Sequence, residues 1–266
     1  MGVWSKFIEK KLLAPGLNII KKLYLIRKVY LTNLFRTFHA QFGEDIILKG
    51  FLLKNISDGF FVDVGCYHPR KYNNTYKLYK KGWRGINIDL DELKIQAFKM
   101  LRPEDCNVLA AVSDKEGTVK VYDFDFFSVI STVNQEVAQK SENEIKWEKE
   151  IKTQTLSSII DSSRFARRQI DVLSVDVEGH DLNVLKSLDF EKYQPKIILI
   201  ESHLMNIDLI INSDLYLFLE EKEYHFINWV GLTLFFVHPD NDILGSLVHS
   251  NFRVATGQEK SDNKGF

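Results

Sequence analysis

Short apolar runs alternate with amphipathic stretches along most of the chain after residue 58. Runs such as FFVDVG, GINID and KIILIE have the length and composition of buried strands. Between them, apolar residues recur at the spacing of a helix face. Strands that alternate with helices predict an α/β fold, with a mostly parallel sheet, right-handed crossovers and helices on both faces. We expect strands at 60–65, 85–89, 107–112, 119–124, 170–176, 196–201, 224–229 and 232–237, and helices at 71–82, 92–101, 181–188 and 215–222.

Other patterns mark the parts around this core. The last two strands turn at Gly231 as a hairpin, which adds an antiparallel strand at one edge of the sheet. The charge-rich stretch 135–154 predicts a solvated helix. Residues 1–38 predict a basic helical arm, interrupted near Pro15 and Gly16, and 255–266 a flexible tail. The domain itself is expected over 39–254.

Composition is that of one globular domain: 266 residues, 45% of them hydrophobic and 27% charged. The two cysteines, Cys66 and Cys106, are too few for a disulfide framework and predict reduced thiols. We expect neither a signal peptide nor a transmembrane helix, and therefore a cytoplasmic protein.

Charge is distributed unevenly along the chain. Of 35 basic and 36 acidic residues, eight basic and one acidic lie in residues 1–39, which leaves the remainder acidic by eight charges. An acidic body argues against a nucleic-acid partner. The arm leaves two alternatives open: it packs on the domain or on a second subunit of a homo-oligomer, or it lies on anionic lipid at the inner face of the membrane.

The turn after the first strand reads Val64-Gly65-Cys66-Tyr67-His68-Pro69, and no further glycine follows until Gly82. A dinucleotide site would need a glycine-rich loop here, so that the backbone can approach a pyrophosphate. Its absence argues against a nicotinamide-dependent oxidoreductase or epimerase. A ligand without phosphates fits better, and S-adenosylmethionine is such a ligand, with an ammonium group that Asp63 can attract.

The next two strand ends suit the rest of that ligand. Asp89 ends the second strand, where a carboxylate can accept hydrogen bonds from both ribose hydroxyls. The third strand ends in Ala111, Val112 and Ser113, whose small side chains leave room for adenine, and Ser113 or Asp114 can bond the adenine amino group.

Several segments together resemble the FkbM-type methyltransferase family. They are QFGED at 41–45, FVDVGCYHP at 61–69, NNT at 73–75, GWRGINID at 82–89, DVLSVDVEG at 171–179 and Ile200-Glu201. The resemblance covers about 39–237 and implies a Rossmann-like class I methyltransferase sheet. It also implies methyl transfer from S-adenosylmethionine, typically to hydroxyl oxygens of sugars or natural products. This chain departs from many members in having no further glycine directly after Gly65.

The resemblance assigns the cofactor site residue by residue. Gln41 and Asp45 are expected to fold over the methionine end, and Asn74 and Thr75 to bond its carboxylate at a helix start. The full set expected to bind the cofactor is Gln41, Asp45, Asp63, Gly65, Cys66, Tyr67, Asn74, Thr75, Asp89, Leu90, Ala111, Val112, Ser113 and Asp176.

Methyl transfer to a hydroxyl needs a base, a metal ion or close alignment. The expected catalytic residues follow the fourth and fifth parallel strands: Asp176, Glu178, His180, Glu201 and His203. Two mechanisms are open. Asp176 or a histidine accepts the proton, or Asp176, Glu178, Glu201 and His203 bind a divalent metal. The sequence favours the metal-free base.

The predicted function is therefore methylation of a hydroxyl, in a sugar of a glycan or glycolipid. The alternative is a non-catalytic cofactor-binding scaffold in a glycan or natural-product pathway. The acidic residues Asp63, Asp89 and Asp176 argue for catalysis, because a strand-end carboxylate is costly unless it has a partner or a function.

Overall fold

The computed structural model describes residues 38–48, 53, 56–123, 131–132 and 147–240. The predicted tail lies outside the described residues, and so does the predicted arm except for Phe38. No helix in the described part of the chain is long and apolar enough to cross a membrane.

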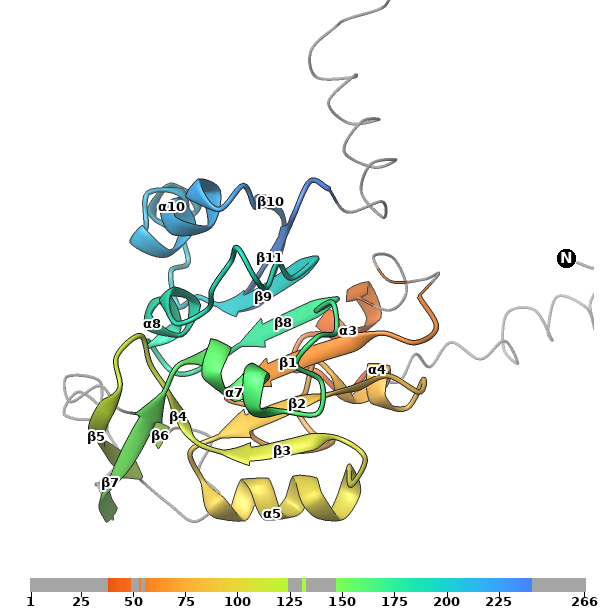
Figure 1. Cartoon of the computed structure of the whole chain (residues 1–266). Helices are drawn as coiled ribbons and strands as arrows, with labels where there is room; N and C mark the ends of the chain where they lie inside the picture. Colours follow the sequence, from red (N-terminus) through yellow and green to blue (C-terminus); the bar gives the residue numbers. More distant parts are fainter. Residues whose placement is uncertain (1–37, 49–52, 54–55, 124–130, 133–146, 241–266) are drawn as a thin grey trace, which may run out of the picture. The chain divides into compact units, whose positions relative to one another are not determined.

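A seven-stranded sheet organises the fold, in the order β10-β11-β9-β8-β1-β2-β3 (Figure 1). The five strands from β3 to β9 pair in parallel. β11 runs antiparallel to both β9 and β10. This confirms the predicted α/β sheet with the hairpin at one edge. β10 is the edge strand, and β11 beside it is the antiparallel strand. The bounds are β1 Phe60–Val64, β2 Arg84–Asp89, β3 Cys106–Leu109, β8 Val172–Val175, β9 Ile197–Glu201, β10 His225–Val230 and β11 Thr233–Val237.

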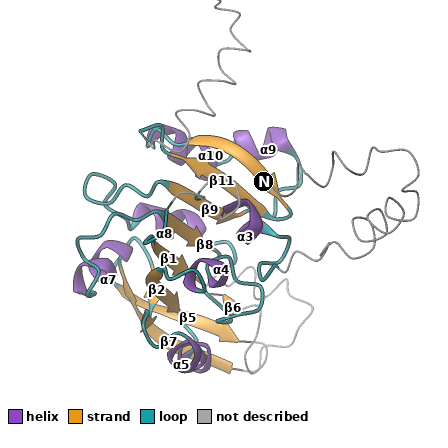
Figure 2. Cartoon of the chain, turned by 90° about the vertical axis from the view of Figure 1, so that its right-hand side faces the viewer, coloured by secondary structure: helices purple, strands orange, loops and turns teal. Residues whose placement is uncertain are grey.

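Apolar side chains alternate between the two faces of this sheet. Val62 and Leu173 belong to one buried cluster, and Phe61 and Val172 belong to another on the opposite face. Because both faces are covered, the central strands read as continuous apolar runs. α7 and α8 lie on one side of the sheet and α3 and α4 on the other (Figure 2). The helices are α3 Glu44–Ile47, α4 Tyr76–Tyr79, α5 Glu92–Leu101, α7 Leu156–Ser162, α8 Asp181–Lys186, α9 Ile207–Ile211 and α10 Asp214–Glu221.

A second, four-stranded sheet follows the order β4-β7-β5-β6. Its strands are β4 Ala111–Val112, β5 Gly117–Asp123, β6 Ser131–Thr132 and β7 Trp147–Gln154. β5 confirms the extra strand expected near 119–124. The solvated helix predicted over 135–154 is wrong for 147–154, which pair with β5 as β7. The rest of that stretch lies outside the described residues.

Two other expectations need correction. The helix predicted over 71–82 forms only at Tyr76–Tyr79, because Asn73 turns its side chain back to the Thr75 amide and breaks the helical bonding pattern. The strand predicted over 107–112 is divided: β3 stays in the main sheet, whereas β4 pairs with β7.

Candidate active site

A cavity of about 300 Å³ opens at the carboxyl ends of the parallel strands. This is where open α/β sheets bind ligands, and the volume is at the lower end of that of small-molecule sites. Most of the residues expected to contact cofactor or acceptor line it. They are Gln41, Gly65, Tyr67, Asp89, Leu90, Ala111, Val112, Ser113, Asp176, Glu178, His180, Glu201 and His203.

The loop after β1 forms the floor of the cavity. Gly65 has φ +75°, and a Cβ at this position would lie 1.7 Å from the backbone oxygen of Asp176. Glycine is therefore required for the β1 and β8 loops to approach so closely. Tyr67, Tyr72 and Glu178 also line the cavity with φ of 52–53°, a strained conformation for residues with a side chain. Such strain is characteristic of functional sites.

Asp89 ends β2 inside the cavity and is 5% exposed. Its Oδ2 accepts the Tyr67 amide at 3.0 Å and its Oδ1 accepts the Asp91 amide at 2.9 Å. Burial raises the pKa of Asp89, and the Lys94 ammonium, 3.8 Å from Oδ1, opposes that shift. Each carboxylate oxygen keeps a second lone pair for a hydroxyl donor.

Small side chains form the wall next to Asp89. Ala111, Val112 and Ser113 are buried there, as expected of an adenine pocket. The Nε2 atom of His180 lies 3.3 Å from Ser113 Oγ, and burial lowers the pKa of this histidine. The structure thus associates His180 with the Ser113 wall, although the sequence suggested a catalytic role.

A group of carboxyl side chains forms the opposite side of the cavity. His203 Nε2 lies 3.3 Å from Glu201 Oε2 and 3.6 Å from Glu178 Oε2. The Asp176 side chain is exposed and lines the cavity. The protein atoms around its carboxyl group desolvate it, and together with the neighbouring Glu201 they raise its pKa well above the usual range. Burial and Glu201 also raise the pKa of Glu178. The group combines two strand ends, β8 and β9.

Asp181 supports this group from behind. Its carboxylate accepts the amides of Val177 and Gly179, each at 3.1 Å, which fixes the turn that carries Glu178. Burial raises the pKa of Asp181 to about 6.

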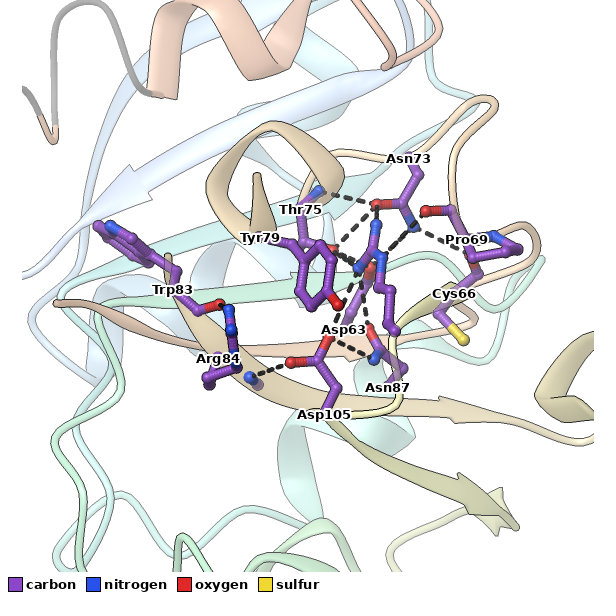
Figure 3. A network of polar contacts seen from close by, with 12 residues as sticks. Asp63, Cys66, Pro69, Asn73, Thr75, Tyr79, Trp83, Arg84, Asn87 and Asp105 are labelled. Carbon is purple, nitrogen blue, oxygen red and sulfur yellow. Dashed lines mark hydrogen bonds and ion pairs between the residues drawn. The ribbon is translucent and has the colours of Figure 1, made fainter. Parts of the chain in front are cut away.

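A buried polar network lies behind the β1 loop (Figure 3). Asp63 Oδ2 accepts hydrogen bonds from Thr75 Oγ1 at 2.8 Å and from Asn73 Nδ2 at 3.1 Å. The guanidinium of Arg102, which is fully buried, donates to Pro69 O, Thr75 Oγ1, Asn73 Oδ1 and Asn87 Oδ1. The network holds the loop between β1 and α4 in position.

Five residues expected at the cofactor do not line the cavity. Asp63 and Thr75 belong to the network behind it, and Asn74 donates to Ser174 Oγ at 3.2 Å. Cys66 packs with Ile95 and Phe98, and Asp45 Oδ2 accepts the His39 amide at 2.9 Å. In this structure the five residues contact other protein groups outside the cavity lining, and their assignment to the cofactor stays a prediction.

Sequence reasoning missed several lining residues, among them Lys94, Tyr72 and Leu232. Lys94 could have been found from the sequence, because it lies close after Asp89 in the first turn of α5. Leu232 carried none, since the turn of the hairpin reaches the cavity only through the order of β9, β11 and β10.

Comparison with known proteins gives one family match. The model described as "Methyltransferase FkbM domain" matches residues 63–226, more than half of the chain. Among solved structures, the chain is similar to a TehB-like SAM-dependent methyltransferase from Corynebacterium glutamicum. The two share 12% sequence identity and a TM-score of 0.39, with 83% of this chain and 96% of that chain covered. The comparison with curated proteins finds no match. The family match includes the strand ends from Asp63 to Glu201.

Proposed function

The chain belongs to the methyltransferase FkbM domain family and is a S-adenosylmethionine-dependent methyltransferase, and from this premise we propose that it methylates a hydroxyl oxygen of a sugar in a glycan or glycolipid. The observation that carries the proposal is a single cavity with Asp89 on one side and the carboxyl groups of Asp176, Glu178 and Glu201 on the other. One side suits the adenosine part of the cosubstrate, and the other suits a hydroxylated acceptor.

The residues at the first side fit S-adenosylmethionine. Asp89 can accept the ribose hydroxyls, and Ala111 with Ser113 leave space for the adenine ring. Gln41 and Gly65 also line the cavity and are assigned to the methionine end. When bound, S-adenosylmethionine supplies an electrophilic methyl group on a positively charged sulfur.

Asp176 is assigned as the proton acceptor. The acceptor oxygen donates an electron pair to the methyl carbon, the carbon–sulfur bond breaks toward sulfur, and the hydroxyl proton passes to the Asp176 carboxylate. The cavity contributes by aligning the two reactants, which supplies a large part of the rate of such displacements. General base assistance adds a factor of about 10² to 10⁴.

Side chains in and beside the cavity support a glycan or glycolipid acceptor. Tyr67 and Tyr72 both line the cavity with nearly parallel rings, 6.5 Å apart, and aromatic rings of this kind suit contact with a sugar. Leu204 and Met205, directly after His203, are 37% and 69% exposed. Exposed apolar side chains next to a polar site suit an acceptor that has both sugar and lipid parts.

A methyl-transfer assay with Asp176→Asn tests this proposal. Wild type should release S-adenosylhomocysteine in the presence of sugar or glycolipid acceptors from a panel that also contains peptide amines. Asp176→Asn should lower kcat by about 10² or more, with S-adenosylhomocysteine affinity within a few-fold of wild type. Asp208→Asn, an exposed aspartate on α9, is the control. Transfer to amines alone, or full activity of Asp176→Asn, would overturn the proposal.

A further inference from the structure

We propose that Glu178, Glu201 and His203 form a binding site for one divalent metal ion at the acceptor side of the cavity. The donor atoms of these three side chains lie within 4.8 Å of one another. They come from two neighbouring strand ends: Glu178 follows β8, and Glu201 ends β9 with His203 just beyond it. The sequence favoured a metal-free mechanism, whereas the geometry points to the other alternative.

Glu201 gives the observation that points most directly to a ligand. Only 10% of its side chain is exposed, and its Oε2 is buried without any hydrogen-bond partner. A buried carboxylate oxygen without a partner is costly, so native proteins almost always satisfy it. His203 Nε2 lies 3.3 Å away, which is within ion-pair distance when the imidazole is protonated, but it makes no hydrogen bond to this oxygen. A cation between the two atoms would satisfy both.

The separations suit shared coordination. Adjacent ligand atoms of an ion with bonds of about 2.1 Å at right angles lie about 3 Å apart. The distances from His203 Nε2 are 3.3 Å to Glu201 Oε2 and 3.6 Å to Glu178 Oε2, so small side-chain shifts complete the site. His203 is 59% exposed on its side chain, which provides a route for the ion from solvent.

The donor set indicates the class of metal. Two carboxylates prefer hard ions such as Mg²⁺ and Mn²⁺, and one imidazole raises the affinity for Mn²⁺ and later transition metals. Three protein donors leave coordination positions open, as catalytic metal sites require. Mn²⁺ therefore fits both kinds of donor and is also a spectroscopic probe.

The role of the ion rests on the proposed function. All three donors line the same cavity as Asp176, and Asp176 lies beside Glu201. A cation at this position would lower the pKa of an acceptor hydroxyl that reaches it and would orient its oxygen. Asp176 would still receive the proton. The metal site itself does not depend on which acceptor is methylated.

Direct Mn²⁺ binding to the purified, metal-stripped full chain tests the site. Titration followed by electron paramagnetic resonance should show saturable binding at about one ion per chain. Glu201→Gln and His203→Ala should each weaken binding by at least about tenfold. Glu220→Gln and His225→Ala, which are exposed and lie away from the cavity, should bind as wild type does. No saturable binding, or equal binding by Glu201→Gln and wild type, would overturn the proposal.

Calorimetry with S-adenosylhomocysteine separates this test from that of the proposed function. Variants that bind S-adenosylhomocysteine with wild-type affinity have an intact cavity, so their loss of Mn²⁺ can be assigned to the missing ligand. Wild type that binds S-adenosylhomocysteine but no Mn²⁺ contradicts the metal site alone. Wild type that binds Mn²⁺ through Glu201 but no S-adenosylhomocysteine contradicts the proposed function alone.

Discussion

Carboxyl groups at the ends of neighbouring strands have different surroundings. Asp63 Oδ2 accepts hydrogen bonds from Thr75 and Asn73, so this carboxylate stabilises the β1 loop. Asp89 faces the cavity and keeps lone pairs free for a ligand. Asp176 also faces the cavity, but beside Glu201. In the proposed function, the surroundings of these carboxylates, more than their places in the chain, assign Asp63 to the loop, Asp89 to the cosubstrate and Asp176 to the proton.

Lys94 should control the pH range in which Asp89 binds the cosubstrate. Its ammonium lowers the pKa of Asp89 against the effect of burial, and only the ionised carboxylate accepts two hydroxyl hydrogen bonds. In Lys94→Met the pKa of Asp89 rises further. The affinity for S-adenosylhomocysteine should then begin to fall at a higher pH than in wild type as the pH is lowered. Calorimetric titrations at a series of decreasing pH values measure this.

The control for that series is Lys99→Met, an exposed lysine on the same helix. Identical pH profiles for Lys94→Met and wild type would show that the ion pair does not tune Asp89.

Asp105 should make the stability of the protein depend on pH. Burial raises its pKa from 3.8 to about 6, although Arg102 and the Gly85 amide favour its charged form. The native state therefore holds this proton more tightly than the unfolded state. Its contribution to the free energy of unfolding is complete below about pH 4 and is lost as the pH rises through about 6, a change of up to roughly 3 kcal/mol.

Urea unfolding at a series of pH values checks this sign. The fall in unfolding free energy between about pH 4 and pH 6.5 should be smaller in Asp105→Asn than in wild type and in the exposed control Asp58→Asn. The same slope in Asp105→Asn and wild type would contradict the assignment.

Residue types at strand ends were predictable, whereas their roles were not. The sequence placed Asp63, Asp89 and Asp176 at or near the carboxyl ends of buried strands, and in the structure Asp63 lies near the end of β1, Asp89 ends β2 and Asp176 follows β8. That Asp63 faces away from the cavity depends on Arg102, which arrives from the end of α5 and organises the β1 loop. No local pattern around Asp63 contains that information.

At the scale of elements, the site depends on the close approach of the loops after β1 and β8. The Asp176 amide donates to Val64 O at 3.0 Å, and the Gly65 amide donates to Ile88 O at 2.9 Å. These bonds join three strand ends into one wall. A side chain at Gly65 would force the loops apart, because it would meet the backbone of Asp176.

Gly65→Ala should therefore lose S-adenosylhomocysteine binding and destabilise the protein by more than about 1 kcal/mol, since alanine is strained at positive φ and would also meet that backbone. Gly117→Ala is a matched control, because a Cβ there meets only Thr153 Oγ1 at 3.9 Å. Thermal unfolding and calorimetry measure the two effects. Equal behaviour of the two variants would contradict the packing described for Gly65.

The strands of the main sheet were predicted well, and several other elements were not. The strands and the helices α5, α8 and α10 agree with their predicted ranges to within a few residues, whereas α4 is shorter than predicted and α7 and α9 were not predicted. β7 was predicted as a helix because its charges conceal a two-residue alternation, in which Thr153 is buried while Glu150 and Lys152 are exposed. Its partner strand β5 supplies the missing bonds, and pairing over that distance cannot be read locally.

At the scale of the whole molecule, the cavity draws its lining from residues between Gln41 and Leu232. The basic charge of the chain is concentrated before that range, and the body carries the acidic excess. We therefore treat recognition of the cosubstrate and contact with a charged surface as separable functions of the chain.

Neutralising part of the basic arm should release the full-length protein from anionic vesicles. Each lysine or arginine near such a surface contributes about 1 kcal/mol. Changing Lys21, Lys22, Arg27 and Lys28 to glutamine should lower binding to phosphatidylserine vesicles by more than about tenfold in a sedimentation assay, with unchanged affinity for S-adenosylhomocysteine. Unchanged vesicle binding would favour the alternative, in which the arm packs on the domain or on a second subunit.

Calorimetric titration of the purified chain with S-adenosylhomocysteine, wild type beside Asp89→Ala and the exposed control Asp58→Ala, tests the assignment of the cavity most directly. Wild type and the control should bind with micromolar affinity, a free energy of about −8 kcal/mol, and Asp89→Ala should show no measurable binding. Absence of binding to wild type, or equal binding to Asp89→Ala, would mean that the cavity between β2 and β9 is not the cosubstrate site.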